Sequence, residues 1–216
     1  KGTHIAVRRL EDFLRKESHH YIRNIFILKC DIRRFFDSVD QQILLNLIKK
    51  RVADPKTIRL IEKVILSFEK SFRKGLPLGN VTSQLFANIY LNELDQFIKH
   101  EVKIKYYLRY CDDFAVVSYD KEYLTGLVSK INIFLNQNLK LELHPKKVIL
   151  RKFSWGIDFL GYIVLPHYIL LRTKTKRRIL KRLIKGEIND KSLPSYLGML
   201  KHCRGFRIKQ QLCSLI

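Results

Sequence analysis

Apolar side chains in the first fifty residues switch between helical spacing and one continuous run. Residues 5–17 repeat apolar positions at the period of a helix, whereas 26–31 is a short apolar run that ends in an acid and is typical of a buried strand. Asp40 stands where an N-cap is expected, because apolar residues at helical spacing begin three positions later. The pattern therefore predicts a helix, a strand and a second helix in this order.

Two more helices and a loop are expected next. One helix begins at about Pro55, and a long one runs from Val81 to about Lys99. Between them, residues 69–80 are basic and contain glycine, which favours a loop.

The second half of the chain centres on two adjacent acids, Asp112 and Asp113, which lie between the apolar runs 106–108 and 114–117. Runs rich in aromatic and β-branched residues predict strands, so the acids are expected at the bend of a β-hairpin. Taken alone, such a pair also fits a solvated turn.

The remaining segments complete an α+β pattern. A helix is expected over about 121–136, and strands over 139–143, where leucine alternates with charge, and over 159–165. From Arg172 to Lys185, cations interleave with apolar residues as in a basic amphipathic helix. The order of elements predicts an α+β fold with a small antiparallel sheet and helices on one face, followed by a separate basic helical segment.

The charge balance indicates a polyanionic partner. The 216 residues include 42 Lys and Arg against 20 Asp and Glu, a formal net charge of +22, with an apolar content of 46% that is ordinary for a globular protein. A field of this sign suits nucleic acid or an anionic membrane surface. No run of about 18 apolar residues occurs, so no membrane span is expected and nucleic acid is the favoured partner.

The cysteines and the start of the chain add two expectations. The four cysteines, at positions 30, 111, 203 and 213, form no C-x-x-C pair and no zinc spacing with histidine, so they are expected to be reduced thiols of a cytoplasmic protein. The chain opens at Lys1 without the apolar segment of a signal peptide, and its only methionine is Met199. It is therefore expected to be a fragment of a longer protein.

Asp31, which ends the first strand, joins the pair Asp112 and Asp113 as a candidate chemical centre. Strand ends distant in sequence can be adjacent in one small sheet. Three carboxylates there suit Mg²⁺, which binds carboxylates together with substrate phosphates. Two such ions about 3.5–4 Å apart are a general device of phosphoryl transfer.

Five segments, in one order, resemble the motifs of reverse transcriptases. Tyr110-Cys111-Asp112-Asp113 matches the Y-x-D-D box of that family, and 29–37 looks like its first carboxylate motif, with an aromatic residue five positions after the acid. Three further segments resemble the loop and helix start under the templating base pair, the segment with the active-site lysine, and the primer grip; these are 75–84, 141–147 and 159–162.

The resemblance implies an RNA-directed DNA polymerase that extends a primer 3′-OH with dNTPs on an RNA template. The primer would be DNA or RNA, and two Mg²⁺ ions, for which Mn²⁺ substitutes, would be the cofactor. Asp31, Asp112 and Asp113 would bind these metal ions together with the backbone carbonyl of Ile32. Lys147 would protonate the leaving pyrophosphate, although Lys147 also fits an ordinary solvated lysine beside Lys146.

Two further groups of residues follow from the resemblance. Phe36 would be the steric gate against a ribose 2′-OH, and Pro77, Leu78 and Gly79 would approach the incoming nucleotide. The template and primer would contact Asn80, Ser83, Gln84, Tyr110, Phe159, Leu160, Gly161, Arg177, Arg178 and Lys181.

The resemblance also implies a division into domains. Residues 1–25 would be the end of the fingers, 26–170 a ferredoxin-like palm with the catalytic centre, and 171–216 the start of a helical, basic thumb, with the N-terminal part of the fingers missing. The basic helix would track the primer–template backbone through its phosphates, while attachment of this helix to a membrane surface stays open.

The loop Leu78-Gly79-Asn80-Val81-Thr82-Ser83-Gln84 departs from the Q-G-x-x-x-S-P pattern of most retroviral and group II intron enzymes. It resembles the reverse transcriptases of diversity-generating retroelements, prokaryotic and phage systems that copy a template RNA with errors at adenines and use a small basic accessory protein. Leu78 lacks the hydrogen-bonding group of glutamine, so lower fidelity is expected.

Other functions stay open. One is a group II intron-like or other bacterial reverse transcriptase. Another is a non-catalytic RNA-binding scaffold with a polymerase palm, against which the three acids and Phe36 argue. The last is a ferredoxin-like RNA-binding module with an incidental Asp pair, whose acids would repel phosphate.

Overall fold

The computed structural model describes residues 2–68, 70–77, 79–189 and 192–213. The chain divides into two compact units: a central unit, Ile27–Leu150, and a terminal unit made of Lys1–Phe26 and Arg151–Ile216. Within the described residues, no helix has the length and apolar character needed to cross a membrane.

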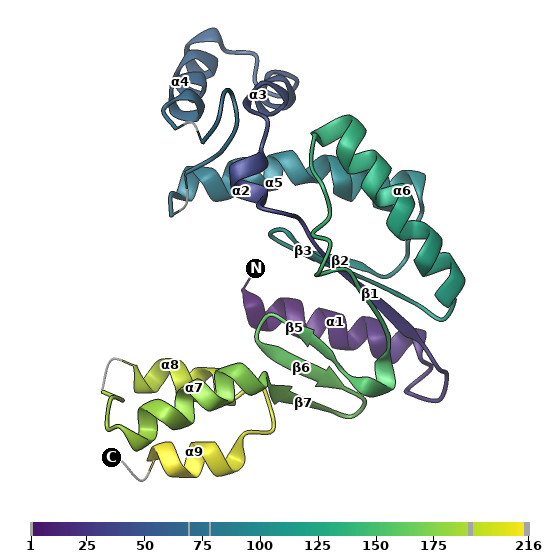
Figure 1. Cartoon of the computed structure of the whole chain (residues 1–216), viewed down its shortest axis with the longest axis vertical. Helices are drawn as coiled ribbons and strands as arrows, with labels where there is room; N and C mark the ends of the chain where they lie inside the picture. Colours follow the sequence, from purple (N-terminus) through teal and green to yellow (C-terminus); the bar gives the residue numbers. More distant parts are fainter. Residues whose placement is uncertain (1, 69, 78, 190–191, 214–216) are drawn as a thin grey trace. The chain divides into compact units, whose positions relative to one another are not determined.

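A four-stranded sheet with the strand order β2-β3-β1-β4 organises the central unit (Figure 1). The strands are β1 (Phe26–Asp31), β2 (Tyr107–Tyr110), β3 (Asp113–Ser118) and β4 (Ile149–Lys152). β2 and β3 form an antiparallel hairpin in which Tyr110 pairs with Asp113, so Cys111 and Asp112 make the turn. Cys111 takes a left-handed backbone conformation there, with φ 55°. The two expected strands and the bend between them are confirmed.

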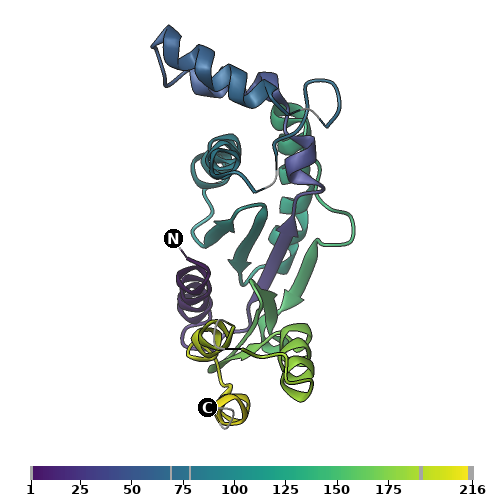
Figure 2. The same ribbon diagram turned by 90° about the vertical axis from the view of Figure 1, so that its left-hand side faces the viewer.

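The helices of the central unit are α2 (Phe35–Ser38), α3 (Gln41–Lys49), α4 (Pro55–Leu66), α5 (Val81–Gln96), the π-helical η1 (Phe97–Glu101) and α6 (Lys121–Leu139). Figures 1 and 2 show α3 and α4 as a pair that extends beyond α2. The core is lined by the apolar faces of β3, α5 and α6; its fully buried members include Phe114, Val116, Tyr90, Leu94, Leu124 and Ile131.

The aspartates Asp40 and Asp54 begin α3 and α4. The Asp40 carboxylate accepts the Ile43 N–H at 3.0 Å and contacts Lys140 Nζ at 2.9 Å, and that of Asp54 accepts the Thr57 N–H at 2.8 Å. Burial opposes ionisation of Asp40, but the Ile43 N–H and Lys140 outweigh it, so the pKa of Asp40 is lowered.

Replacing Asp40 by alanine is expected to lower the free energy of unfolding by about 2 kcal/mol, because both the cap and the Lys140 contact are lost. The matched change Asp54→Ala, at an exposed cap, should cost less. Because a lowered pKa stabilises the fold above the ordinary carboxyl range, the Asp40 effect should fade as the pH falls through the folded pKa. Urea unfolding at pH 7 and pH 3 measures both; equal losses at the two pH values would contradict the Asp40 assignment.

The terminal unit combines α1 (Thr3–Glu17) with a three-stranded antiparallel sheet, β5 (Ile157–Phe159), β6 (Tyr162–Leu165) and β7 (Tyr168–Leu171). A short 3-10 turn, η2 (Phe153–Trp155), precedes the sheet, and α7 (Thr173–Ile184), α8 (Leu193–Leu200) and α9 (Phe206–Cys213) follow it. α1 packs on β6, as Figures 1 and 2 both show.

Two expected strands are wrong. The helix predicted to end at about 136 continues to Leu139, Lys140 closes it with φ 49°, and only an isolated bridge between Leu143 and Ile32 remains of the strand over 139–143. The expected strand 159–165 is instead two strands, because Leu160 and Gly161 turn the chain with φ of 49° and 90°.

The observed architecture is a mixed α+β fold with antiparallel sheets, as expected. The structural units divide at Phe26/Ile27 and Leu150/Arg151. The assignment of 1–25, 26–170 and 171–216 to fingers, palm and thumb stays a prediction.

Candidate active site

Three carboxylates meet at one end of the central sheet. Asp31 is the last residue of β1, Asp113 is the first of the neighbouring strand β3, and Asp112 lies in the turn before it. Burial raises the pKa of Asp112 and of Asp113, and the negative charge of Asp31 raises both further. Strand ends that are 81 residues apart in sequence (112 − 31) are therefore brought together, as expected.

Two lysines compensate this negative charge. Lys147 Nζ lies 2.9 Å and 3.0 Å from the two carboxylate oxygens of Asp31, and Lys29 Nζ lies 3.5 Å from Asp113 Oδ1. The hydrogen bond to Asp31 raises the pKa of Lys147. Lys147 is thus the lysine of the predicted segment that reaches the acids. Sequence reasoning missed Lys29, although its position two residues before Asp31 places both on one face of β1.

Backbone contacts fix the position of the segment that carries Lys147. The His144 N–H donates to the Asp31 carbonyl at 2.8 Å, and the Arg33 N–H donates to the Glu142 carbonyl at 2.9 Å. The buried Ile32 forms the isolated bridge to Leu143 between these two contacts. The segment therefore runs beside the end of β1 without being a strand.

The donor set of this centre fits a hard divalent cation. Asp31, Asp112 and Asp113 offer only carboxylate oxygens, and the raised pKa values of Asp112 and Asp113 show that added positive charge would be favourable. Among the described residues no three Asp, Glu, His or Cys side chains are gathered closely enough to hold a metal ion by themselves. Mg²⁺ is usually bound through one or two carboxylates together with substrate phosphates.

Arg109 on β2 braces the hairpin that carries Asp112. Its guanidinium donates to both carboxylate oxygens of Asp95 on α5, at 2.9 Å and 2.7 Å, and to the carbonyl of Cys111 in the turn, at 3.0 Å. Tyr107 donates its hydroxyl to the same Asp95 carboxylate at 2.7 Å. Sequence reasoning missed this network, because Asp95 and Arg109 lie in different elements and no local pattern links them.

Phe36 lies beside the predicted nucleotide loop. The Leu76 N–H donates to the Phe36 carbonyl at 2.8 Å, and the buried Gln41 amide donates to the carbonyl of Gly75 at 3.1 Å. The half-buried Phe36 ring makes an edge contact with the buried ring of Phe35 at 5.3 Å. The loop is therefore attached to α2 and α3, which follow Asp31 in the chain.

The other residues predicted to bind nucleotide and template fall around the start of α5. Pro77 is half-buried, Gly79 is exposed with φ 92°, and Leu78 lies outside the described residues. Asn80 is the residue before the helix, Gln84 is exposed, and Ser83 is 2% exposed with a hydroxyl that has no hydrogen-bond partner among the described residues. Tyr110, half-buried, ends β2 next to the turn.

The remaining predicted contacts belong to the terminal unit. Phe159 is buried at the end of β5, and Leu160 and Gly161 form the turn to β6. Arg177, Arg178 and Lys181 are exposed on α7, whose buried residue is Ile179. These residues and the carboxylates thus lie in different units.

Comparison of the sequence with known proteins finds relatives that include an intron-encoded protein. The chain is 25% identical to the group II intron-encoded protein LtrA of Lactococcus lactis subsp. cremoris, over 61% of this chain and 33% of the relative. It is 24% identical to the protein YkfC of Escherichia coli (strain K12), over 75% of this chain and 52% of the relative. The chain therefore spans about a third to a half of the length of these relatives.

The fold is similar to that of solved telomerases. Apo telomerase from Candida tropicalis, truncated from its C-terminal domain, matches 80% of this chain and 40% of that chain with a TM-score of 0.61 and 17% identity. Telomerase from Candida albicans, in complex with a fragment of telomeric RNA, matches 80% and 34% with a TM-score of 0.62 and 13% identity. At these identities the likeness concerns the fold alone.

The family comparison covers most of the chain. The family described as reverse transcriptase (RNA-dependent DNA polymerase) matches residues 4–164. This range contains the three carboxylates, Lys147, Phe36 and the loop before α5. The chain belongs to the reverse transcriptase family.

Proposed function

We propose that this chain carries the catalytic centre of an RNA-directed DNA polymerase, which extends a primer 3′-OH with dNTPs on an RNA template. The observation that supports the proposal most is the convergence of Asp31, Asp112 and Asp113 with Lys147 at one sheet end. A solvated turn would not bury two carboxylates against a third. We place the activity in the cytoplasm of a prokaryote or of a phage-infected cell, as the bacterial relatives suggest.

Divalent metal ions, two Mg²⁺ or Mn²⁺ held by Asp31, Asp112, Asp113 and the Ile32 carbonyl, would supply charge stabilisation for the attacking and leaving oxygens. Lys147 holds a proton at Nζ, because Asp31 raises its pKa. Neutralisation of the Asp31 charge by bound metal ions would lower the pKa of Lys147 again. The Nζ proton would then be easier to donate to the leaving pyrophosphate. The loop from Gly75 to Gly79 and the Phe36 ring would position the nucleotide.

Primer extension tests the proposal directly. The protein is given a labelled DNA primer on an RNA template with dNTPs and either Mg²⁺ or excess EDTA. Extension that requires the metal, and that persists in the control Asp37→Asn, supports the polymerase. Salt-sensitive RNA binding without extension under any metal would favour the non-catalytic scaffold.

Phe36→Ala is expected to raise the use of rNTPs relative to dNTPs by about 30-fold, because the ring would no longer fill the space of a ribose 2′-OH. The ratio of kcat/KM for rUTP and dTTP measures this change. Phe72→Ala serves as the control, since Phe72 is 81% exposed on the loop before Gly75. An unchanged ratio in Phe36→Ala would contradict the role of a steric gate.

We further propose that the loop after Pro77 makes synthesis error-prone at template adenines, as in diversity-generating retroelements with their small basic accessory protein. The proposal rests on the sequence L-G-x-x-x-S-Q alone. Leu78→Gln is then expected to reduce misincorporation opposite adenine several-fold, whereas Leu85→Gln, the same change on exposed α5, should not. Unchanged error spectra in Leu78→Gln would favour a group II intron-like enzyme, to which LtrA points.

A further inference from the structure

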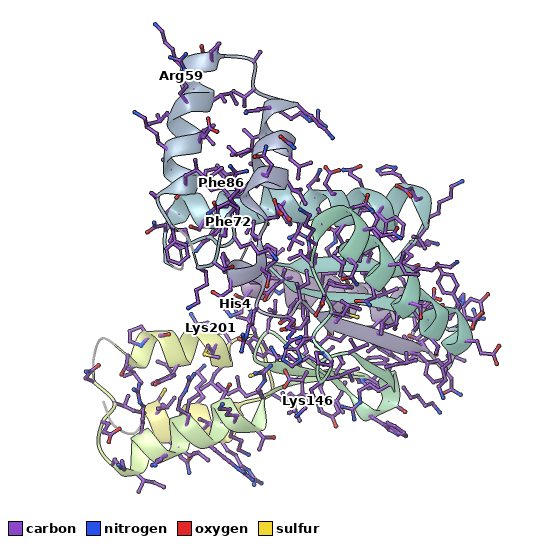
Figure 3. All side chains as sticks on the ribbon, turned by 45° about the horizontal axis from the view of Figure 1, so that its top comes forward. His4, Arg59, Phe72, Phe86, Lys146 and Lys201 are labelled. Atoms are coloured by element: carbon purple, nitrogen blue, oxygen red, sulfur yellow. The ribbon has the colours of Figure 1, made fainter. Side chains whose placement is uncertain are left out.

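A pocket of about 380 Å³ in the terminal unit gathers cations and aromatic rings that the proposed polymerase centre does not use. It lies between α1, the β6–β7 hairpin and the turn after α8, and Figure 3 labels His4 and Lys201 at its wall. Its lining includes Arg8, Lys201 and Arg204, and Glu11 is its one acidic residue among those described.

The frame of the pocket is well defined. Tyr162, buried on β6, donates its hydroxyl to the Met199 carbonyl of α8 at 3.1 Å. The Arg204 N–H donates to the Ile169 carbonyl of β7 at 2.8 Å. These two bonds tie the turn that carries Lys201, His202 and Arg204 to the sheet, so the positive side chains are placed by the fold.

A cationic side chain and two imidazole rings are held close together on one side of the pocket. The Arg8 guanidinium donates to Nδ1 of His202 at 3.2 Å, and the imidazole rings of His4 and His202 lie with their centroids 3.9 Å apart, tilted by 32°. Burial, and then the charges of His4, Arg8 and Lys201, lower the pKa of His202. Because Arg8 donates to Nδ1, His202 is in its neutral form there, and the positive charge on this side of the pocket comes from Arg8 and Lys201, which an anion in the pocket would neutralise.

The pocket also offers flat surfaces for stacking. His4 and His202 present half-buried rings, and the Arg204 guanidinium lies over the Tyr168 ring at 4.9 Å. Unstacked bases of single strands stack on aromatic rings and on arginine planes, while their phosphates pair with cations. A double helix is far too wide for a pocket of this volume.

We propose that this pocket binds a nucleotide of single-stranded nucleic acid, with its phosphate against Arg8, Lys201 and Arg204 and its base on the aromatic rings. The proposal requires no polymerase activity. An RNA single strand and a DNA single strand share this chemistry, and the binding experiment distinguishes the two sources.

The test compares neighbouring arginines of α1 in the 216-residue chain. Arg8 lines the pocket, whereas Arg9 is exposed outside it and lies over Phe13. Fluorescence anisotropy is measured with labelled uridine and thymidine octamers and with a 20-base-pair RNA duplex. Arg8→Gln should raise the Kd of the preferred octamer about tenfold and Arg9→Gln less than about twofold, because one removes a direct phosphate contact and the other only general charge.

Three further readouts complete the experiment. The duplex should bind Arg8→Gln and Arg9→Gln alike. An octamer with 4-thiouridine or 4-thiothymidine should crosslink to the peptides that contain Tyr168 or His202. Arg204→Gln, checked by circular dichroism, repeats the loss if Arg8→Gln is unstable. Equal losses in Arg8→Gln and Arg9→Gln, a parallel loss of duplex binding, or crosslinks only elsewhere would overturn the proposal.

Discussion

Replacing Asp112 by asparagine is expected to abolish primer extension and to leave the fold at least as stable as before. Loss of a carboxylate at the proposed metal centre should lower kcat by about 10³-fold or more, since groups that act as a unit fail together. Asparagine has nearly the same shape but no charge, so the turn formed by the exposed Cys111 and the half-buried Asp112 should keep its geometry.

The stability gain follows from the sign of the pKa shift. The pKa of Asp112 is raised in the fold, chiefly by burial and then by the charges of Asp31 and Asp113. Folding therefore favours the protonated carboxyl, and stability is lost as the pH rises from the ordinary carboxyl range through the raised pKa. Asp112→Asn removes this loss, so its advantage should be largest at neutral pH and vanish at pH 3.

Thermal unfolding in EDTA at pH 7 and pH 3, beside primer extension in Mg²⁺, measures both effects. Added Mg²⁺ should raise the Tm of the parent more than that of Asp112→Asn, because only the parent keeps the full ligand set. Asp37→Asn is the control, as it removes one acid without touching the carboxylate centre. Retained extension in Asp112→Asn, or a lower Tm in EDTA at pH 7, would contradict the assignment.

Local patterns predicted most of the frame of this site. Apolar runs marked β1 and the hairpin, the N-cap Asp40 marked α3, and Pro55 marked the start of α4, because these signals lie within a few residues of one another. The strand predicted from the alternation over 139–143 was wrong, although the burial pattern was right. Leu139, Leu141 and Leu143 are all buried as an alternating pattern predicts, but the backbone finds only one bridge, to Ile32.

The side-chain partners that residues find on other elements could not be predicted from the sequence. The Y-x-D-D resemblance identified the acids, yet Lys29 beside Asp113 and the choice of Lys147 over Lys146 depend on how strands and loops meet in space. The sequence does not distinguish Arg109 from the other cations of this basic chain. Its side chain is only 9% exposed, and its role depends on its ion pair with Asp95, which lies on another element.

Arg109→Met is expected to cost about 3 kcal/mol of unfolding free energy, because it leaves Asp95 charged and partly buried without its partner. It should also lower kcat by about tenfold, since the Cys111 carbonyl loses the donor that fixes the turn before Asp112. Urea unfolding and single-turnover primer extension measure the two effects. Arg59→Met, a change of the same type on exposed α4, should alter neither.

A second substitution separates stability from positioning. Asp95→Asn, added to Arg109→Met, removes the uncompensated charge and keeps an oxygen for the Tyr107 hydroxyl, so about half of the lost stability should return. The Cys111 carbonyl still lacks its donor in this double variant, so kcat should stay low while the KM for the primer–template is unchanged. Recovery of kcat together with stability would show that Arg109 acts only as a structural ion pair, whereas a low kcat in a restabilised fold identifies it as the residue that positions the catalytic turn.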